Sequence, residues 1–444
     1  MLISVIFFLF ISLAIISGLV GPTVREFKNA SVDLKSKQSY FLAESGTEDA
    51  IYRIINNITI SNSEILTLNN NSATTTISNL FGNSKQISSL GDVGNLQRET
   101  NVTLQAGAGV GFNYGIQSGD GGFILSGGST ITGNVYSSGN IQASSGVHIT
   151  GTAITSGPTS YIGDGVGNPW MGTVVIGTEG VGDAWAYKVL GANVAGNLYC
   201  QLPATFPTGS KNNKDCDPSR GIPPAQPMPF TDENIIAWKN AASAGGIITN
   251  PIGSNSSTCR QNKNCPCPGN SSSDNNAKNC VVDDVDATFG PGKITGNLTV
   301  NGGGTLTLTG TVWVVGKVTV TGGGNIKLPA NYALNSETII SDNLVTINGG
   351  GSLGSGNPNS YLFIVSTSTS NSAITVTGGA GAIAVDAQKG TVVLSGNASL
   401  NAAVGKTITA TGGTNVTYQQ GLASPSFQSG PSGGWTFGGW GETQ

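Results

Sequence analysis

The stretch "GKITGNLTVNGGGTLTLTGTVWVVGKVTVTGGGNIKL", residues 292–328, repeats one pattern several times. Short runs of Val, Leu, Ile and Thr, which suit strands, are closed by glycine-rich corners. Glycine allows the positive φ that such corners require. A β-solenoid needs this order of strand and turn, because each coil buries its apolar face only by stacking on the next coil. The stretch therefore predicts a glycine-rich β-solenoid, or β-helix-like, fold.

The same pattern occurs on both sides of this stretch, in "GGFILSGGSTITGNVYSSGNIQASSG" and in "AITVTGGAGAIAVDAQKGTVVLSGNASL". Coils of about 20 residues would place roughly ten coils in residues 110–196 and 291–420, a rod on the order of 50 Å. An antiparallel β-sandwich is the alternative fold. Its hairpins favour two-residue Asn-Gly or Asp-Gly turns, whereas Gly-Gly-Gly dominates here.

Composition excludes several classes of protein. The chain has 444 residues and 66 glycines, and charged residues make up 10% of it, where about 25% is usual. Its formal net charge of −4 includes no basic stripe, so the electrostatic footprint of a nucleic-acid-binding protein is missing. We therefore expect a mainly β protein that binds no nucleic acid.

The N-terminus, "MLISVIFFLFISLAIISGLVGPTV", carries no charge over residues 1–24. As a helix it would be about 36 Å long, enough to cross the apolar core of a bilayer. A cleaved signal peptide is the alternative, but it needs a basic n-region and a small-residue cleavage site. Gly18, Gly21 and Pro22 are expected to weaken the helix near the end of this segment.

A charged helix is predicted to continue directly from the apolar segment. Its stretch "SYFLAESGTEDAIYRI", residues 39–54, is followed by "INNI", and apolar residues recur there at helical spacing. The predicted buried face consists of Ala50, Ile51, Ile54, Ile55 and Ile58. Residues 1–58 are therefore expected to form one long helix, half membrane-spanning and half amphipathic.

This combination resembles the N-terminal region of type IV pilin-like proteins, especially minor pilins and pseudopilins with an A-E-[SAG]-G-x-E-x-A stretch. The resemblance covers about residues 1–58. It implies an apolar helix that is stored in the inner membrane and then packs against other pilin-like subunits in a filament core. The residues expected to make these packing contacts are Val5, Phe7, Phe8, Phe10, Leu13, Gly18 and Pro22.

Two features depart from that family. The basic leader ending in Gly, which a prepilin peptidase cuts, is missing, and no acidic residue precedes Glu26. We expect that the sequence starts inside the leader region; a different mode of insertion is the alternative.

All six cysteines lie in one insertion, residues 197–290, and an even number in an exported chain predicts three disulfides. They are Cys200, Cys216, Cys259, Cys265, Cys267 and Cys280. Cys200 with Cys216 is the first expected pair, and the pairing of the other four stays open. A zinc site is the alternative, but paired C-x-x-C spacing is missing from this sequence. The insertion also predicts one short helix, capped by Thr231 or Asp232 and stopped by Gly245, with Ile235, Trp238 and Ala242 buried.

Candidate ligand sites are few. Asp283, Asp284 and Asp286 could hold Ca²⁺ through carboxylate oxygens, although a solvated loop is the favoured interpretation. Three aromatic residues could stack on sugar rings, although most such residues pack in cores; they are Trp170, Trp185 and Tyr187. Glu337, Asp342 and Asp386 stand apart in the sequence, and the single histidine cannot form a triad, so we expect no enzyme and no cofactor.

The sequence therefore predicts a non-catalytic, surface-exposed type IV pilin-like subunit, minor or tip-located, whose head makes adhesive or cell-envelope contacts with a surface glycan or protein. The alternatives are a membrane-anchored extracellular β-helix that binds or cleaves polysaccharide, and a pseudopilin of a secretion or DNA-uptake system. The expected parts are the helix (1–58), a connecting β-rich region (59–109), a first solenoid part (110–196), the cysteine-rich insertion (197–290), a second solenoid part (291–420) and a C-terminal tail or cap (421–444).

Overall fold

The computed structural model describes residues 2–55, 58, 60–80, 85–106, 111–144, 146–164, 174–178, 181–205, 215–248, 279–332, 335–354, 360–378, 384–427 and 435–443. It is mainly β, with several sheets and one long N-terminal helix. The chain forms two compact units. The first unit comprises residues 1–106 and 435–444, and the second comprises residues 107–434.

The first unit joins a helix to an antiparallel sheet. Helix α1 (Leu2–Ile55) runs without interruption through Pro22. The sheet order is β1-β2-β3-β4-β36, and all its pairs are antiparallel. Its strands are β1 (Ser63–Leu68), β2 (Asn71–Asn79), β3 (Lys85–Val93), β4 (Leu96–Ala106) and β36 (Trp435–Thr443).

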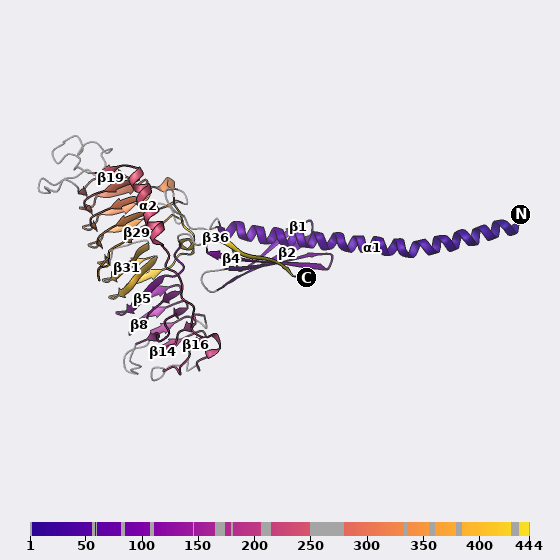
Figure 1. The fold of residues 1–444 in the computed structure, drawn as a ribbon, viewed down its shortest axis with the longest axis horizontal. Helices are drawn as coiled ribbons and strands as arrows, with labels where there is room; N and C mark the ends of the chain where they lie inside the picture. Colours follow the sequence, from indigo (N-terminus) through magenta and orange to yellow (C-terminus); the bar gives the residue numbers. More distant parts are fainter. Residues whose placement is uncertain are drawn as a thin grey trace. The chain divides into compact units, whose positions relative to one another are not determined.

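The C-terminal half of α1 packs closely on this sheet (Figure 1). Two glycines make the close approach possible. A Cβ on Gly91 would lie 2.1 Å from the carbonyl oxygen of Ser39, and a Cβ on Gly46 would lie 2.7 Å from Oγ1 of Thr75. At both positions any larger residue would force the helix away from the sheet.

The buried face of α1 differs from the prediction at its end. Ala50, Ile51 and Ile54 are buried, as predicted. Ile55 and Ile58 are 40% and 45% exposed, which corrects the expectation that they face the core. The helix ends at Ile55, so the helical spacing that placed Ile58 on this face does not continue to it. The other buried helix residues are Ser39, Leu42, Ala43, Gly46 and Thr47.

The C-terminal strand also corrects a prediction. The sequence predicts that residues 421–444 form a C-terminal tail or cap. Instead β36 pairs with β4, from Trp435 opposite Ala106 to Thr443 opposite Glu99, and so belongs to the first unit. The β4 edge offers unpaired backbone groups to a further strand, whereas the apolar pattern of the tail alone does not indicate which edge it completes.

The second unit consists of parallel ladders. Apart from an isolated bridge between Thr178 and Val181, every described strand pair in it is parallel. This is the pairing that stacked coils require, and it differs from the antiparallel pairing of a sandwich built from hairpins. The longest ladder system has 21 strands, and two further ladders have six and four.

The strands of the first half of this unit are β5 (Ile116–Leu125), β6 (Thr130–Thr132), β7 (Val135–Ser137), β8 (Ile141–Ala143), β9 (His148–Ile149), β10 (Ala153–Thr155), β11 (Tyr161–Gly163), β12 (Val174–Ile176), β13 (Ala184–Trp185), β14 (Lys188–Leu190), β15 (Ala192–Val194) and β16 (Leu198–Tyr199). Those of the second half are β17 (Ile247–Ile248), β18 (Cys280–Asp283), β19 (Asp286–Phe289), β20 (Gly292–Ile294), β21 (Leu298–Asn301), β22 (Thr305–Leu308), β23 (Val312–Val314), β24 (Val318–Val320), β25 (Asn325–Lys327), β26 (Asn335–Ser341), β27 (Val345–Ile347), β28 (Ser352–Gly354), β29 (Leu362–Ser366), β30 (Ile374–Val376), β31 (Ala384–Leu394), β32 (Ser399–Leu400), β33 (Ala402–Ala410), β34 (Asn415–Thr417) and β35 (Ser426–Phe427).

The two halves form one continuous stack, although the insertion separates them in sequence. β5 pairs with β33 on one side and with β7 and β8 on the other. The chain therefore enters in the middle of the stack, winds to one end at β16, and crosses to the far end at β17 and β18. From there it winds back to the middle (Figure 1).

Glycines follow successive parallel strands and lie against one another. Gly302, Gly322 and Gly349 have φ between 56° and 58°. A Cβ on Gly349 would lie 3.2 Å from the backbone nitrogen of Gly322. Positive φ and this close approach together favour glycine at these positions. On the strands that precede these glycines, Val300, Val320 and Ile347 are fully buried and in register.

The segment that crosses the stack, residues 217–247, is called the strap. Its first and last parts join the ladders at the two ends, where Asp217 bridges to Tyr199 and Ile247 pairs with Lys293. It contains the 3₁₀ turn Pro218–Arg220 and α2 (Asp232–Ala244). Short 3₁₀ turns also occur at Ala330–Tyr332 and Gln420–Ala423.

The predicted short helix is confirmed in detail. α2 is capped by Thr231, whose Oγ1 accepts a hydrogen bond from the backbone N–H of Asn234, and its C-cap is Gly245. Its buried residues are Ile235, Trp238 and Ala242. Trp238 packs on Phe230 and Phe427, with ring centroids 5.0 Å apart in both pairs. α2 is thereby fixed along the side of the stack.

Candidate functional site

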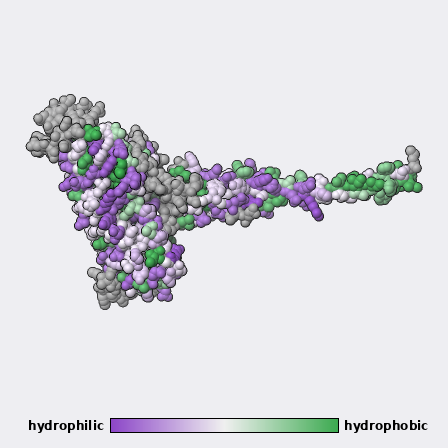
Figure 2. All heavy atoms as spheres, viewed as in Figure 1, coloured by the Kyte–Doolittle hydropathy of each residue, from purple (hydrophilic) through white to green (hydrophobic). Residues whose placement is uncertain are grey.

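The apolar part of α1 is exposed along its whole length. By length and composition alone, α1 is long and apolar enough to cross a membrane, and its most apolar window has no buried residue. Figure 2 shows this part of the helix in green, followed by polar residues. The predicted packing residues lie here: Val5, Phe7, Phe8, Phe10 and Leu13 are between 60% and 68% exposed, and Gly18 and Pro22 follow them on the same helix.

Gly18 and Pro22 stand one helical turn apart. Pro22 has no N–H to donate to the carbonyl of Gly18, and its ring crowds that carbonyl. Position 18 is not crowded, because no atom lies within 4 Å of where a Cβ would be. The helix is continuous here, but this turn lacks one backbone hydrogen bond and is its weakest point.

Hydroxyl side chains in the apolar segment donate hydrogen bonds to backbone carbonyls of the same helix. Ser12 donates a hydrogen bond to the carbonyl of Phe8 at 2.7 Å, and Thr23 donates to the carbonyl of Leu19 at 2.8 Å. Ser17 donates to the carbonyl of Ala14 at 3.1 Å. Hydroxyls bonded in this way suit a helix that lies in lipid or against other apolar helices.

Beyond residue 24 the helix carries charges that suit water. Lys37 pairs with Asp33 at 2.8 Å, and Arg53 pairs with Asp49 at 2.9 Å, both at i,i+4 spacing. Each pair is exposed, so each adds only about 0.3–0.5 kcal/mol. The change from uncharged to charged surface therefore occurs near Arg25 on one continuous helix.

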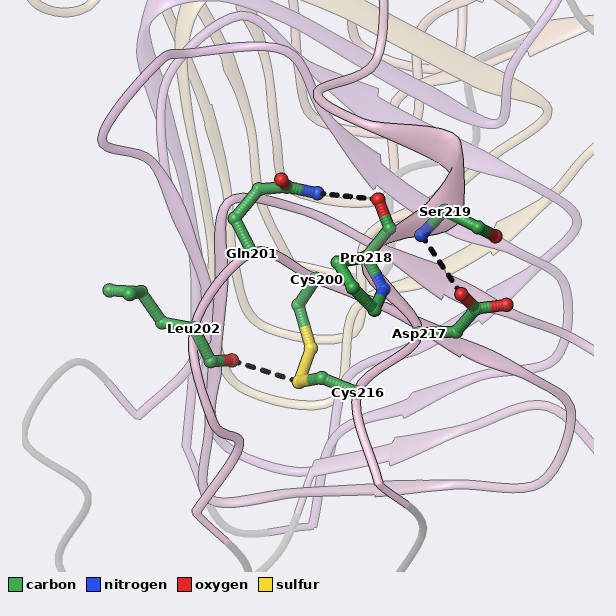
Figure 3. The surroundings of a disulfide bond; sticks show 7 residues. All are labelled: Cys200, Gln201, Leu202, Cys216, Asp217, Pro218 and Ser219. Atoms are coloured by element: carbon green, nitrogen blue, oxygen red, sulfur yellow. Dashed lines mark hydrogen bonds between the residues drawn. A yellow bond between two sulfur atoms is a disulfide. The ribbon is translucent and has the colours of Figure 1, made fainter.

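The disulfide predicted first is present in the structure. Cys200 and Cys216 are joined, with their Cα atoms 5.2 Å apart, so the bond links the end of β16 to the start of the strap (Figure 3). Asp217, next to the bond, accepts a hydrogen bond from the backbone N–H of Ser219. Cys280, at the far end of the stack, is also disulfide-bonded. Cys259, Cys265 and Cys267 lie outside the described residues.

The aromatic candidates for sugar stacking are engaged by the strap. Trp185 donates a hydrogen bond from Nε1 to the carbonyl of Gly221 at 2.8 Å. The guanidinium of Arg220 lies 3.9 Å from the ring centroid of Tyr199 and 5.7 Å from that of Trp185. Tyr187 is half-buried, and Trp170 lies outside the described residues. The indole N–H of Trp185 is therefore bonded to the strap, and Arg220 lies over its ring.

The acidic residues considered as calcium ligands do not form a metal site in the described part of the chain. In the described part of the chain, no group of three or more His, Cys, Asp or Glu residues is placed to hold a metal ion, and this includes the cluster at Asp283, Asp284 and Asp286. Asp284 occupies the positive-φ turn between β18 and β19. The three side chains are thus divided between two strands and a turn.

Two carboxylates that stand apart in the sequence, Glu337 and Asp342, form hydrogen bonds or ion pairs with residues of the interior and of the strap. Glu337 is fully buried and accepts hydrogen bonds from Tyr332 at 2.7 Å and Thr311 at 3.0 Å. Burial, and then this hydrogen bond, hold the pKa of Tyr332 well above its usual range. Asp342 accepts a hydrogen bond from Trp313 and pairs with Lys239 of α2. No spacing in the sequence indicated these contacts.

Asp386 is fully buried in β31, beside β29 and β33. One carboxylate oxygen accepts a hydrogen bond from the backbone N–H of Gln388, and Oδ2 has no partner within the described residues. Burial raises the pKa of Asp386 to about 7.

Comparisons with known proteins do not assign this chain to a family. No protein-family model matches the chain, and no curated protein is similar to it. Among solved structures, the competence-associated pilin ComZ from Thermus thermophilus is similar at 13% identity and a TM-score of 0.32, covering 92% of this chain and 97% of that one. The C-terminal domain of tapirin from Caldicellulosiruptor kristjanssonii is similar at 12% identity and a TM-score of 0.16, covering 70% of this chain and 56% of that one. At TM-scores this low, neither likeness carries an argument about fold or function.

Proposed function

We propose that this chain is a non-catalytic, surface-exposed type IV pilin-like subunit. One observation carries the proposal: the first half of α1 is an exposed apolar rod, while the second half of the same helix packs on an antiparallel sheet. An exposed apolar surface of this length is stable only in lipid or against other apolar helices. Storage in the inner membrane followed by packing against other pilin-like subunits supplies both surroundings.

The second unit is the head of this subunit, and we interpret its stacked parallel ladders as a β-solenoid. Residues 107–434 form the larger part of the chain, and a head of this size would crowd every position of a repeating filament. A minor or tip position therefore fits the chain better than the major one. In that position the head is available for adhesive contacts with a surface ligand.

The proposal is tested by immunogold electron microscopy of intact cells and of sheared surface material, with antibody to the head. Label on filaments or at their tips supports it. Label confined to the membrane, with bare filaments, contradicts it and leaves an anchored β-helix.

A matched pair of variants makes the test specific to α1. Phe8→Asp places a charge in the apolar segment and is expected to remove label from filaments. Ile65→Asp changes a residue of β1 that is equally exposed, at 68%, and is expected to leave the label unchanged. Equal loss with both variants would indicate a defect in expression or folding rather than in helix packing. Equal retention would contradict the role given to the apolar segment.

A further inference from the structure

One column of outward-pointing side chains runs along the stack of the second unit. Parallel pairing places its members in register on eight successive strands. We call it the threonine column, and its members are Thr299, Thr319, Thr346, Thr375, Val393, Thr409, Ile124 and Gln142. Adjacent strands are about 4.8 Å apart, so the column extends over roughly 34 Å. It offers a regular row of hydroxyl and methyl groups on a rigid support.

The hydroxyl groups of this column are available. Thr299, Thr319, Thr346, Thr375 and Thr409 are all partly exposed. Across the part of the chain that the structure describes, their hydroxyls form no hydrogen bond with the protein, in contrast to those of Thr311 and Thr367. Each can therefore both donate to and accept from a ligand. The neighbouring outward positions, such as Thr321 and Thr377, add further hydroxyls.

The column is also uncharged. None of its members is ionisable, and among the residues two before and two after each member, Lys317 is the only charged one. An anionic ligand would find one positive charge near the row, that of Lys317, and a cationic ligand would find no carboxylate within two residues of any member. The chemistry of the column thus selects a neutral ligand rich in hydroxyl groups.

Two other outward faces differ from it. The face that carries Gln117, Tyr136 and Trp185 is covered by the strap, since these side chains bond to Pro227, Gln226 and Gly221 at 2.7–2.8 Å. The face formed by β19, β22, β25 and β28 carries charges at Asp286 and Lys327. In contrast, the threonine column is uncharged, and all its members are at least partly exposed.

We propose that the threonine column binds a neutral, extended polysaccharide. Such a chain presents hydroxyl groups at regular intervals along its edges, so successive rungs can bond to successive sugars. Each contact is weak, and affinity comes from repetition along the row. This explains how the head could hold a glycan although Trp185 is occupied. The proposal concerns the head alone and holds whether or not the chain enters a filament.

The test uses the purified full-length chain in detergent, sedimented with insoluble β-1,4-glucan or with chitin particles. Soluble polygalacturonate serves as the anionic comparison. The wild type is expected to sediment with at least one neutral polymer and not to be competed by the polyanion. Thr346→Lys combined with Thr375→Lys places two charges on adjacent rungs and should weaken binding at least about tenfold. Thr346→Val combined with Thr375→Val removes only the hydroxyls and should weaken it by a smaller factor.

The matched control is Thr288→Lys combined with Thr307→Lys. These threonines are also outward-facing and lie on adjacent rungs, β19 and β22, but on another face. Binding should stay within about twofold of wild type. Circular dichroism must show the same spectrum and unfolding temperature for all three double variants.

The proposal is wrong if the wild type sediments with neither neutral polymer. It is also wrong if the column and control variants lose binding equally, or if the polyanion competes for binding. Self-association of the wild type that Thr346→Lys with Thr375→Lys abolishes, without a change in glycan binding, would also overturn it, because the column would then be an interface between copies. Loss of filament label in cells, by contrast, leaves the glycan result unaffected.

Discussion

At the scale of single residues, Asp386 is the most informative. Its carboxylate is fully buried, and only one of its oxygens is bonded within the described residues. Burial of a carboxylate with one unbonded oxygen disfavours its charged form, because water no longer solvates the charge. This cost is absent from the unfolded chain, so Asp386 makes the stability of the second unit depend on pH.

We predict that Asp386→Asn stabilises the second unit at alkaline pH. Burial raises the pKa to about 7; the folded state then holds a proton that the unfolded state releases. Wild-type stability is therefore lost as pH rises from about 4 to 7, by up to about 4 kcal/mol. The variant should match wild type near pH 4 and exceed it at pH 8. Calorimetric unfolding at both pH values measures this, and a gain that does not vary with pH would contradict the role of ionisation.

At the scale of elements, the strap connects parts that the sequence separates. Lys239 of α2 pairs with Asp342 and lies 5.3 Å from the ring centroid of Trp313, over which Lys293 also lies at 3.6 Å. Asp232 pairs with Lys389 of β31. The ion pairs are partly exposed and contribute little each, so most of the stability of the strap comes from its buried aromatic side chains.

We predict that Trp238→Ala destabilises the second unit by about 3–5 kcal/mol, because it leaves a cavity among Phe230, Phe363 and Phe427. Ile236→Ala is the matched control on the same helix. Its side chain is 56% exposed, and its effect should stay within about 0.5 kcal/mol. Denaturant unfolding of the full chain checks both. Similar losses for the two variants would show that helix propensity, rather than burial, fixes α2.

At the scale of the whole molecule, the chain leaves the first unit after β4 and returns to it at β36. The last strand thus completes a sheet whose other strands were formed more than 300 residues earlier in the chain. Because β36 covers an edge of β4, the stability of the first unit depends on the C-terminus.

We predict that deletion of residues 435–444 exposes β4 and speeds hydrogen exchange at Val102 and Leu104, both buried in the complete chain. Exchange in β21 and β24 should not change, since these strands belong to the second unit. Glu442→Gln is the control. It removes only the 3.5 Å contact of Glu442 with Arg98 and should change stability by less than about 0.5 kcal/mol. Unchanged exchange at Val102 after deletion would contradict the prediction.

The sequence by itself determined the long helix, its apolar and charged halves, the strands closed by glycine corners and the short helix at 232–244. It also suggested the bond between Cys200 and Cys216. These features depend on local periodicity, turn chemistry and short separation along the chain. Only the tertiary structure decided which strand pairs with which. Segments that share Val, Thr and Gly at equivalent positions can pair in several orders with similar energy, so no local signal places β5 beside β33.

The same reason explains the remaining differences. The strap over Trp185, the pairing of β36 with β4 and the exposure of Ile55 all depend on contacts between distant segments. The sequence pattern of residues 435–443 would be the same whichever sheet edge this strand joined. Local chemistry therefore determines the helices and strands. The partner of each strand is chosen among chemically similar segments only when the whole chain folds, because burial and backbone pairing compete directly in the folded chain.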